Sequence, residues 1–296
     1  MEMSDDVRKI SFRKIRNVAG IEYVKWIFNP RMIIFAVLCI FLYDYVIEVM
    51  LDGAVRTEGY IMVLEPFIAM ANSELLIMVL PAVFIVLMSD FPKTDGNTMF
   101  YIQRVGKLNW VFGQMVFGIM AVATYLSGIV ITSFVTVAHK AYAKNMWSPL
   151  ITSYEKMFPN ERESRIPMLI NGRMFNNMTP VQAFLLTFTL LFLYFVIMEM
   201  LLLVGFSAGK RMIGMIVCYT VIGVGSSLCG MGNDIQWGFP AAHSLAWLHF
   251  DYVLKVQSVN IKYSYLYFII LFLTLAVISL TAIRRYDFSK ITDMED

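Results

Sequence analysis

Three long segments of this sequence carry no charged side chain, and they restrict the possible folds more than any other feature. They run from Val111 to Ala138, from Met212 to Asn233 and from Tyr263 to Ile283. A helix needs roughly 20 mostly apolar residues to cross a bilayer, and each segment is that long. Of the 296 residues, 58% are hydrophobic and only 16% are charged. This is more apolar surface than the interior of a soluble protein of this size can bury. The sequence therefore predicts an all-α integral membrane protein.

Three further apolar segments bring the predicted number of transmembrane helices to six. One contains a single acid, Glu199, another contains Asp44 and Glu48, and the third is short and begins at Glu74. We expect one transmembrane domain over residues 1–296, with spans at approximately 32–51, 74–89, 111–137, 181–206, 212–231 and 263–283.

The distribution of basic residues predicts how the chain is oriented. Six spans place both termini on the same side of the membrane. If that side is the cytoplasm, the inner segments hold 15 Lys and Arg, and the longer outer segments hold nine. Basic residues are then about twice as dense inside, as the positive-inside rule requires. Both termini are therefore predicted to be cytoplasmic.

Shorter amphipathic segments flank the predicted spans. Residues 11–28 place apolar side chains on roughly one helical face, which predicts a cytoplasmic helix along the inner membrane surface. An ordinary basic juxtamembrane helix is the alternative. Outside, residues 59–70 and 238–250 are apolar but too short to span, so we expect short re-entrant or interfacial helices there, including one before span six.

Enzymatic and metal-binding chemistry finds little support in the sequence. The glycines of Gly205 to Arg211 are too closely spaced for a phosphate-binding loop, and Arg211 stands where Ser or Thr would reach magnesium. His243 and His249 are six residues apart, which does not favour a metal pair on one helical face. We therefore predict no catalytic residue, no metal and no bound cofactor. The net charge of +2 gives no indication of nucleic-acid binding.

The predicted inner loop between spans two and three carries the most information. An acidic turn at Asp95-Gly96 leads into a short apolar-aromatic segment, Thr98 to Ile102, and a basic pair follows. A loop of this length is long for joining two antiparallel helices. Its aromatic centre suits a groove on a partner protein, although it could instead rest on the membrane surface. The residues of interest are Asp90, Asp95, Gly96, Phe100, Tyr101, Arg104 and Lys107.

This loop resembles that of the ABC-2 type transporter permease family, in which an acidic-glycine stretch, a small helix and an Arg-rich turn dock against a separate ATPase subunit. The family's frequent Arg-Pro-x-x-Arg turn stands here as Arg104-Val-Gly-Lys107. Residues 284–288 after the last span, and the order of the helices, also look like that family. The resemblance implies a bacterial plasma-membrane exporter with two permease subunits, identical or paired, and two ATPase subunits that bind ATP and Mg.

Four acidic residues lie within or beside the predicted spans and are candidates for the substrate pathway. Asp44 and Glu48 share one helical face in the outer half of the first span, and Glu74 begins the second. Together with the nearby outer acids they favour a cationic or amphipathic substrate such as a small peptide. Alternatively, Asp44 and Glu48 are solvated at the interface. For Glu199, pairing with a basic group of a neighbouring helix is favoured over a carboxylate that reaches the interface.

Two other functional classes fit the same spans. An ion-coupled secondary transporter would use Asp44, Glu48 or Glu199 as coupling-ion sites, but repeated halves and helices broken by Gly or Pro at the midplane are not evident. A non-transporting immunity or sensor protein would bind an extracellular peptide through the loop at 139–180. Co-purification with an ATPase would separate these alternatives from a permease.

Overall fold

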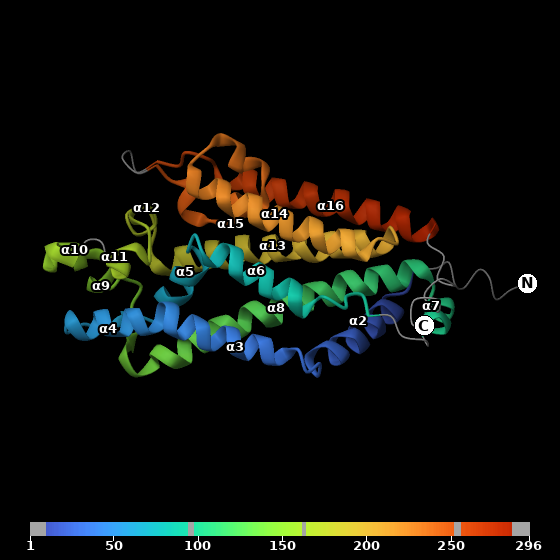
Figure 1. Ribbon diagram of the computed structural model, residues 1–296, viewed down its shortest axis with the longest axis horizontal. Coiled ribbons are helices and arrows are strands. Elements are labelled where there is room, and N and C mark those ends of the chain that lie inside the picture. The colour runs from blue at the N-terminus through green and yellow to red at the C-terminus, as the bar shows by residue number, and fades with distance from the viewer. Residues whose placement is uncertain (1–9, 94–97, 162–163, 252–255, 286–296) are drawn as a thin grey trace, which may run out of the picture.

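The protein is a helical multi-pass membrane protein, and its helices lie in one elongated bundle (Figure 1). The computed structural model describes residues 10–93, 98–161, 164–251 and 256–285. Within these ranges, five helical segments are long and apolar enough to cross a membrane. They are α3 to α4 (Met32–Leu42 and Glu48–Arg56), α8 (Lys107–Val137), α13 (Pro180–Ser207), α14 (Arg211–Met231) and α16 (Ile261–Arg285). The predicted all-α fold is confirmed.

A bent pair of helices stands where the second span was predicted. The helices α5 (Glu65–Ala71) and α6 (Leu76–Leu87) meet at an angle of 83° and together make the sixth candidate span. Alone, α6 rises only about 18 Å, well short of a hydrocarbon core of about 30 Å. The hydroxyl of Ser73 accepts a hydrogen bond from the Leu76 N–H at 3.4 Å and so helps to begin α6.

The first span is longer than predicted and is interrupted by a π-helical turn at Tyr43–Ile47. It continues past Leu51 to Arg56, because its last turns pack against the long loop that follows α8. At Gly53 an added Cβ would lie 2.5 Å from Leu150 Cδ1. The glycine therefore lets the loop approach the helix backbone closely.

The N-terminal helix α2 (Phe12–Ile27) packs along α8 and is not an isolated surface helix. Its buried face consists of Val18, Ala19, Glu22 and Trp26. The two helices touch at Gly113, where an added Cβ would lie 2.5 Å from Val18 Cβ. Glu22, which interrupts the apolar stripe in the sequence, is part of this buried face.

The segments between the spans fold into short elements at the end of the bundle that carries α9 to α12 (Figure 1). Strands β1 (Ile61–Met62) and β2 (Ala141–Tyr142) pair in parallel. The carboxylate of Glu65 is fully buried and accepts hydrogen bonds from the backbone N–H groups of Met62 and Ser148. The short helices are α9 (Pro149–Thr152), α10 (Tyr154–Met157), α11 (Arg165–Met168), α12 (Gly172–Phe175) and α15 (Pro240–Ser244). Turns of 3-10 helix cover Ala138–Lys140, Pro159–Glu161, Asp234–Gly238 and Ala246–His249.

The predicted short helices before the last span are present, but they are buried in protein. All five residues of α15 are buried, as are Ala246 to His249. They pack against α13, α14 and α16, so this segment is an internal part of the bundle.

Candidate functional site

The helix α7 (Thr98–Val105) lies within the predicted inner loop and is amphipathic. Ile102 and Val105 are buried against the bundle, whereas 71% of Phe100 is exposed and Arg104 is exposed as well. Gly106, with φ of 92°, separates α7 from α8. Few other residues adopt this backbone conformation, so Gly106 allows α7 to turn away from the long span. The predicted short helix is confirmed and extends to Val105.

The partly buried side chain of Tyr101 lies near α2. Burial raises the pKa of its phenol, the Glu22 carboxylate raises it further, and the Lys25 ammonium lowers it. Lys107 is the first residue of α8 and is half-buried. Of the predicted coupling residues, Asp95 and Gly96 lie outside the described residues.

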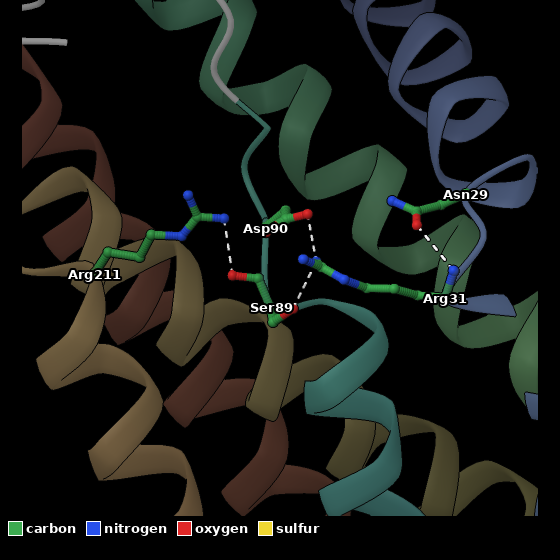
Figure 2. Close-up of polar contacts among 5 residues, drawn as sticks. All are labelled: Asn29, Arg31, Ser89, Asp90 and Arg211. Carbon is green, nitrogen blue, oxygen red and sulfur yellow. Dashed lines mark hydrogen bonds and ion pairs between the residues drawn. The ribbon is translucent and has the colours of Figure 1, made fainter. Parts of the chain in front are cut away.

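A small polar cluster ties the start of the inner loop to two other elements (Figure 2). Arg31, at the α2–α3 junction, forms an ion pair with Asp90 and donates a hydrogen bond to Ser89 Oγ at 2.7 Å. From the start of α14, Arg211 Nη2 donates to the Ser89 carbonyl oxygen at 2.8 Å. The Asn29 side chain accepts from the Arg31 backbone N–H at 3.0 Å. We call Arg31, Ser89, Asp90 and Arg211 the loop clamp.

The loop clamp contributes little to the free energy of unfolding, but it holds distant segments together. The Arg31 and Asp90 side chains are 40% and 45% exposed, and ion pairs at such sites contribute about 0–1 kcal/mol. The cluster instead fixes positions, because one hydrogen-bond network joins the start of the inner loop, the start of α3 and the start of α14. The residues at the start of the inner loop are therefore held to the start of α3 and to the start of α14.

The candidate pathway acids are not brought together into one site. Asp44 and Glu48 are exposed on the first span, on and just after the π-helical turn. Glu74 is exposed at the α5–α6 bend. Glu199 is fully buried on α13, where its carboxyl group packs against Gly118 of α8.

The predicted pairing of Glu199 with a basic group is wrong for the part of the chain that the structure describes. Neither carboxylate oxygen has a hydrogen-bond partner there. Both polar atoms of Gln114, one turn before Gly118 on α8, are likewise buried and without hydrogen bonds among the described residues. An added Cβ at Gly118 would lie 2.1 Å from Glu199 Cδ, so the glycine makes the space that the carboxyl group occupies.

Two cavities of about 560 and 540 Å³ open near the end of the bundle opposite α7. Glu74, Asn171 and Trp247 line both of them. The Trp247 indole donates a hydrogen bond to the Asn72 carbonyl oxygen at 3.1 Å, and the Arg173 guanidinium lies over the Trp247 ring, 5.6 Å from its centroid. Asp44 and Glu48 are not among the lining residues, so Glu74 is the pathway candidate that faces these cavities.

Sequence reasoning missed the roles of Arg31 and Asn72. Arg31 flanks the first span like any basic residue at a membrane boundary, and nothing local indicates its pairing with Asp90. Asn72 holds the outer segment in place, since its side-chain oxygen accepts from the Ala246 N–H at 3.0 Å and its amide donates to Thr187. Its position in the α5–α6 break was the only available signal.

Across the described residues, no group of three or more His, Cys, Asp or Glu side chains is placed to hold a metal ion. The family resemblance of the inner loop rests on its own residues and on the order of the helices. No protein-family model, curated protein or solved structure matches this chain.

Proposed function

We propose that this chain is the permease subunit of an ATP-binding-cassette exporter in a bacterial plasma membrane, with both termini in the cytoplasm. The basic segments that the positive-inside rule assigns to the cytoplasm support this orientation, because α2, α7, the turn at Lys210 and the end of α16 gather at one end of the bundle (Figure 1). That end is then the cytoplasmic one.

The observation that carries the proposal is the exposed face of α7. A short helix that buries Ile102 and Val105 yet exposes Phe100 and Arg104 presents an aromatic anchor with a basic rim. Aromatic and arginine side chains are the residues that dominate protein interfaces. We infer that α7 is the coupling helix and that Asp90, Tyr101 and Lys107 support it.

In this proposal, the energy of ATP hydrolysis reaches the permease through α7. ATP and Mg are bound by a partner ATPase, and closure of that ATPase displaces α7. Its buried residues pass the movement to α8, and the loop clamp passes it to α3 and α14. A single subunit of six spans is too small to enclose a path for a bulky solute, so we infer two permease subunits and two ATPase subunits. The chain itself is a transport subunit and not an enzyme.

The substrate leaves toward the end that carries α12. Glu74 lies at two cavities there, with Trp247 as an aromatic wall, and Asp44 and Glu48 add negative charge on the first span. Carboxylates beside aromatic rings suit a cation. This supports a cationic or amphipathic peptide as substrate, and Glu199 is a candidate for the deeper part of the path.

The test is reconstitution with candidate ATPases encoded near the gene for this chain. The ATPase that belongs to the complex should remain bound during purification, and in proteoliposomes the permease should raise its rate of ATP hydrolysis. Failure of all of them to bind would contradict the proposal.

The same vesicles test a second candidate, an ion-coupled transporter, which the buried carboxyl group of Glu199 favours. Solute movement driven by an ion gradient without any ATPase, and lost in Glu199→Gln, would replace the exporter with this alternative.

A further inference from the structure

Two histidines at the end opposite α7 converge on one serine. His243 of α15 places Nδ1 2.7 Å from Ser264 Oγ, and His249 places Nε2 2.7 Å from the same oxygen. Ser264 lies in the first turn of α16. Ser264 and His249 are fully buried, and His243 is 5% exposed. Ser264 of the last span thus bridges the two histidines of the outer segment.

The other ring nitrogens fix how hydrogens are distributed. His243 Nε2 lies 2.9 Å from the Trp237 carbonyl oxygen, and His249 Nδ1 lies 3.1 Å from the Leu245 carbonyl oxygen. Carbonyl oxygens only accept, so each of these nitrogens must carry a hydrogen to make its bond. A neutral imidazole has one hydrogen, which leaves both nitrogens that face Ser264 as acceptors.

The hydroxyl of Ser264 has one hydrogen and cannot donate to two acceptors. Four contacts require four hydrogens, and the neutral trio has three. One contact must then bring two lone pairs together, unless one more proton is present. With that proton, one ring donates to Ser264 Oγ, the hydroxyl donates to the other ring, and both carbonyl bonds remain.

We propose that His243, Ser264 and His249 form a binding site for a single proton, which the two imidazoles share through the serine hydroxyl. Either ring can carry the charge, because reversing the hydroxyl exchanges donor and acceptor. The site goes beyond the transport function and does not depend on it. It links residues 234–249 to α16, so the bound proton completes the attachment of the outer segment to the last span.

The surroundings favour one proton and disfavour a second. The Trp237 ring lies 5.3 Å from both imidazoles, and the Tyr267 ring stacks on His243 at 4.0 Å. Burial lowers the pKa of His243, and burial together with the charge of His243 lowers the pKa of His249 to about 4. A doubly charged pair is therefore disfavoured, while a single charge gains a hydrogen bond.

The other titratable groups on the elements packed around the pair do not supply a counter-charge. No carboxylate contributes to the pKa shift of either histidine among the described residues. These other groups are Tyr194 and Glu199 on α13, Arg211, Cys218, Tyr219 and Cys229 on α14, Arg173 on α12, Asp234 in the 3-10 turn before α15, Asp251 two residues after His249, and Lys262, Tyr263, Tyr265, Tyr267, Arg284 and Arg285 on α16. Hydrogen bonding in the trio is therefore what retains the proton.

The chain has three histidines, which makes the test direct. The full-length protein, labelled with ¹⁵N only in its histidine rings, is titrated in lipid nanodiscs by NMR. The exposed His139 gives the third ring signal, so that all three histidines are followed in one sample. We expect His243 and His249 to shift together with one shared midpoint, below the ordinary histidine value of about 6.5, and to take up one proton in total.

Two serine variants on α16 complete the test. Ser264→Ala removes the bridge and should lower the shared midpoint by about one pH unit, since a hydrogen bond to a charged group is lost. Ser279→Ala, which removes another fully buried hydroxyl of the same helix, should leave it unchanged. Two separate one-proton titrations, no proton uptake above about pH 4, or an unchanged midpoint in Ser264→Ala would each overturn the proposal.

Discussion

Replacing Gly205 with valine should force α13 and α14 apart and strongly destabilise the folded protein. An added Cβ at Gly205 would lie 2.5 Å from Gly214 Cα and 3.0 Å from Gly214 N. Because backbone faces backbone, no side chain can move aside, and the helices must separate. Overpacking a well-filled site costs 1–3 kcal/mol and occasionally more, and we expect about 3 kcal/mol or above here. The melting temperature in detergent should fall by about 10 °C.

The matched control makes the same substitution at Gly223 of α14, away from this contact. At Gly223 an added Cβ meets nothing within 4 Å, so Gly223→Val should change stability by only about 0.5 kcal/mol. Equal melting temperatures for the two variants would mean that the close approach of α13 and α14 is wrong. The packing of α13 against α14 matters for function because it places Arg211, at the start of α14, within hydrogen-bond distance of the Ser89 carbonyl oxygen.

Replacing Phe100 with aspartate should uncouple the permease from its ATPase while the fold survives. The ring is 71% exposed and contributes little to the bundle, so the melting temperature should change little. At an interface, a central aromatic anchor contributes about 2 kcal/mol or more, and its loss corresponds to about 30-fold weaker binding. We expect the affinity for the ATPase to fall by this factor and the stimulation of ATP hydrolysis to disappear.

Two further variants separate docking from a general surface effect. Tyr60→Asp changes an aromatic residue that is 64% exposed directly before β1, among the short elements between the spans and not on α7, and it should leave ATPase binding intact. Arg104→Glu reverses a rim charge and should mainly slow association in a salt-dependent way. If Phe100→Asp binds the ATPase as tightly as the wild type does, α7 is not the docking element.

The parts of the fold that depend on local pattern were predictable. Uncharged stretches gave the positions of α8, α14 and α16 within a few residues, because charge and apolarity alone set where a helix can enter lipid. The amphipathic pattern after Asp95 likewise predicted α7. In contrast, the angle of 83° between α5 and α6 is set by packing, and a bent pair has the same hydropathy as a straight span.

The candidate site was predictable only in part, since its contacts join distant residues. The proximity of Arg31, Asp90 and Arg211 depends on how three helices end at one place, and no spacing in the sequence encodes it. The expectation of a basic partner for Glu199 followed from the cost of burying a charge. It did not anticipate that Gly118 would provide the space that the carboxyl group fills.

The sidedness of α7 tests the central claim most directly. A variant with Phe100→Cys is compared with Met157→Cys, a residue of α10 that is 52% exposed at the other end of the bundle. With a membrane-impermeant maleimide, the account predicts that intact cells label Met157→Cys only and that inside-out vesicles label Phe100→Cys only. Labelling of Phe100→Cys in intact cells would place the helix on the wrong side for any cytoplasmic ATPase and would contradict the account.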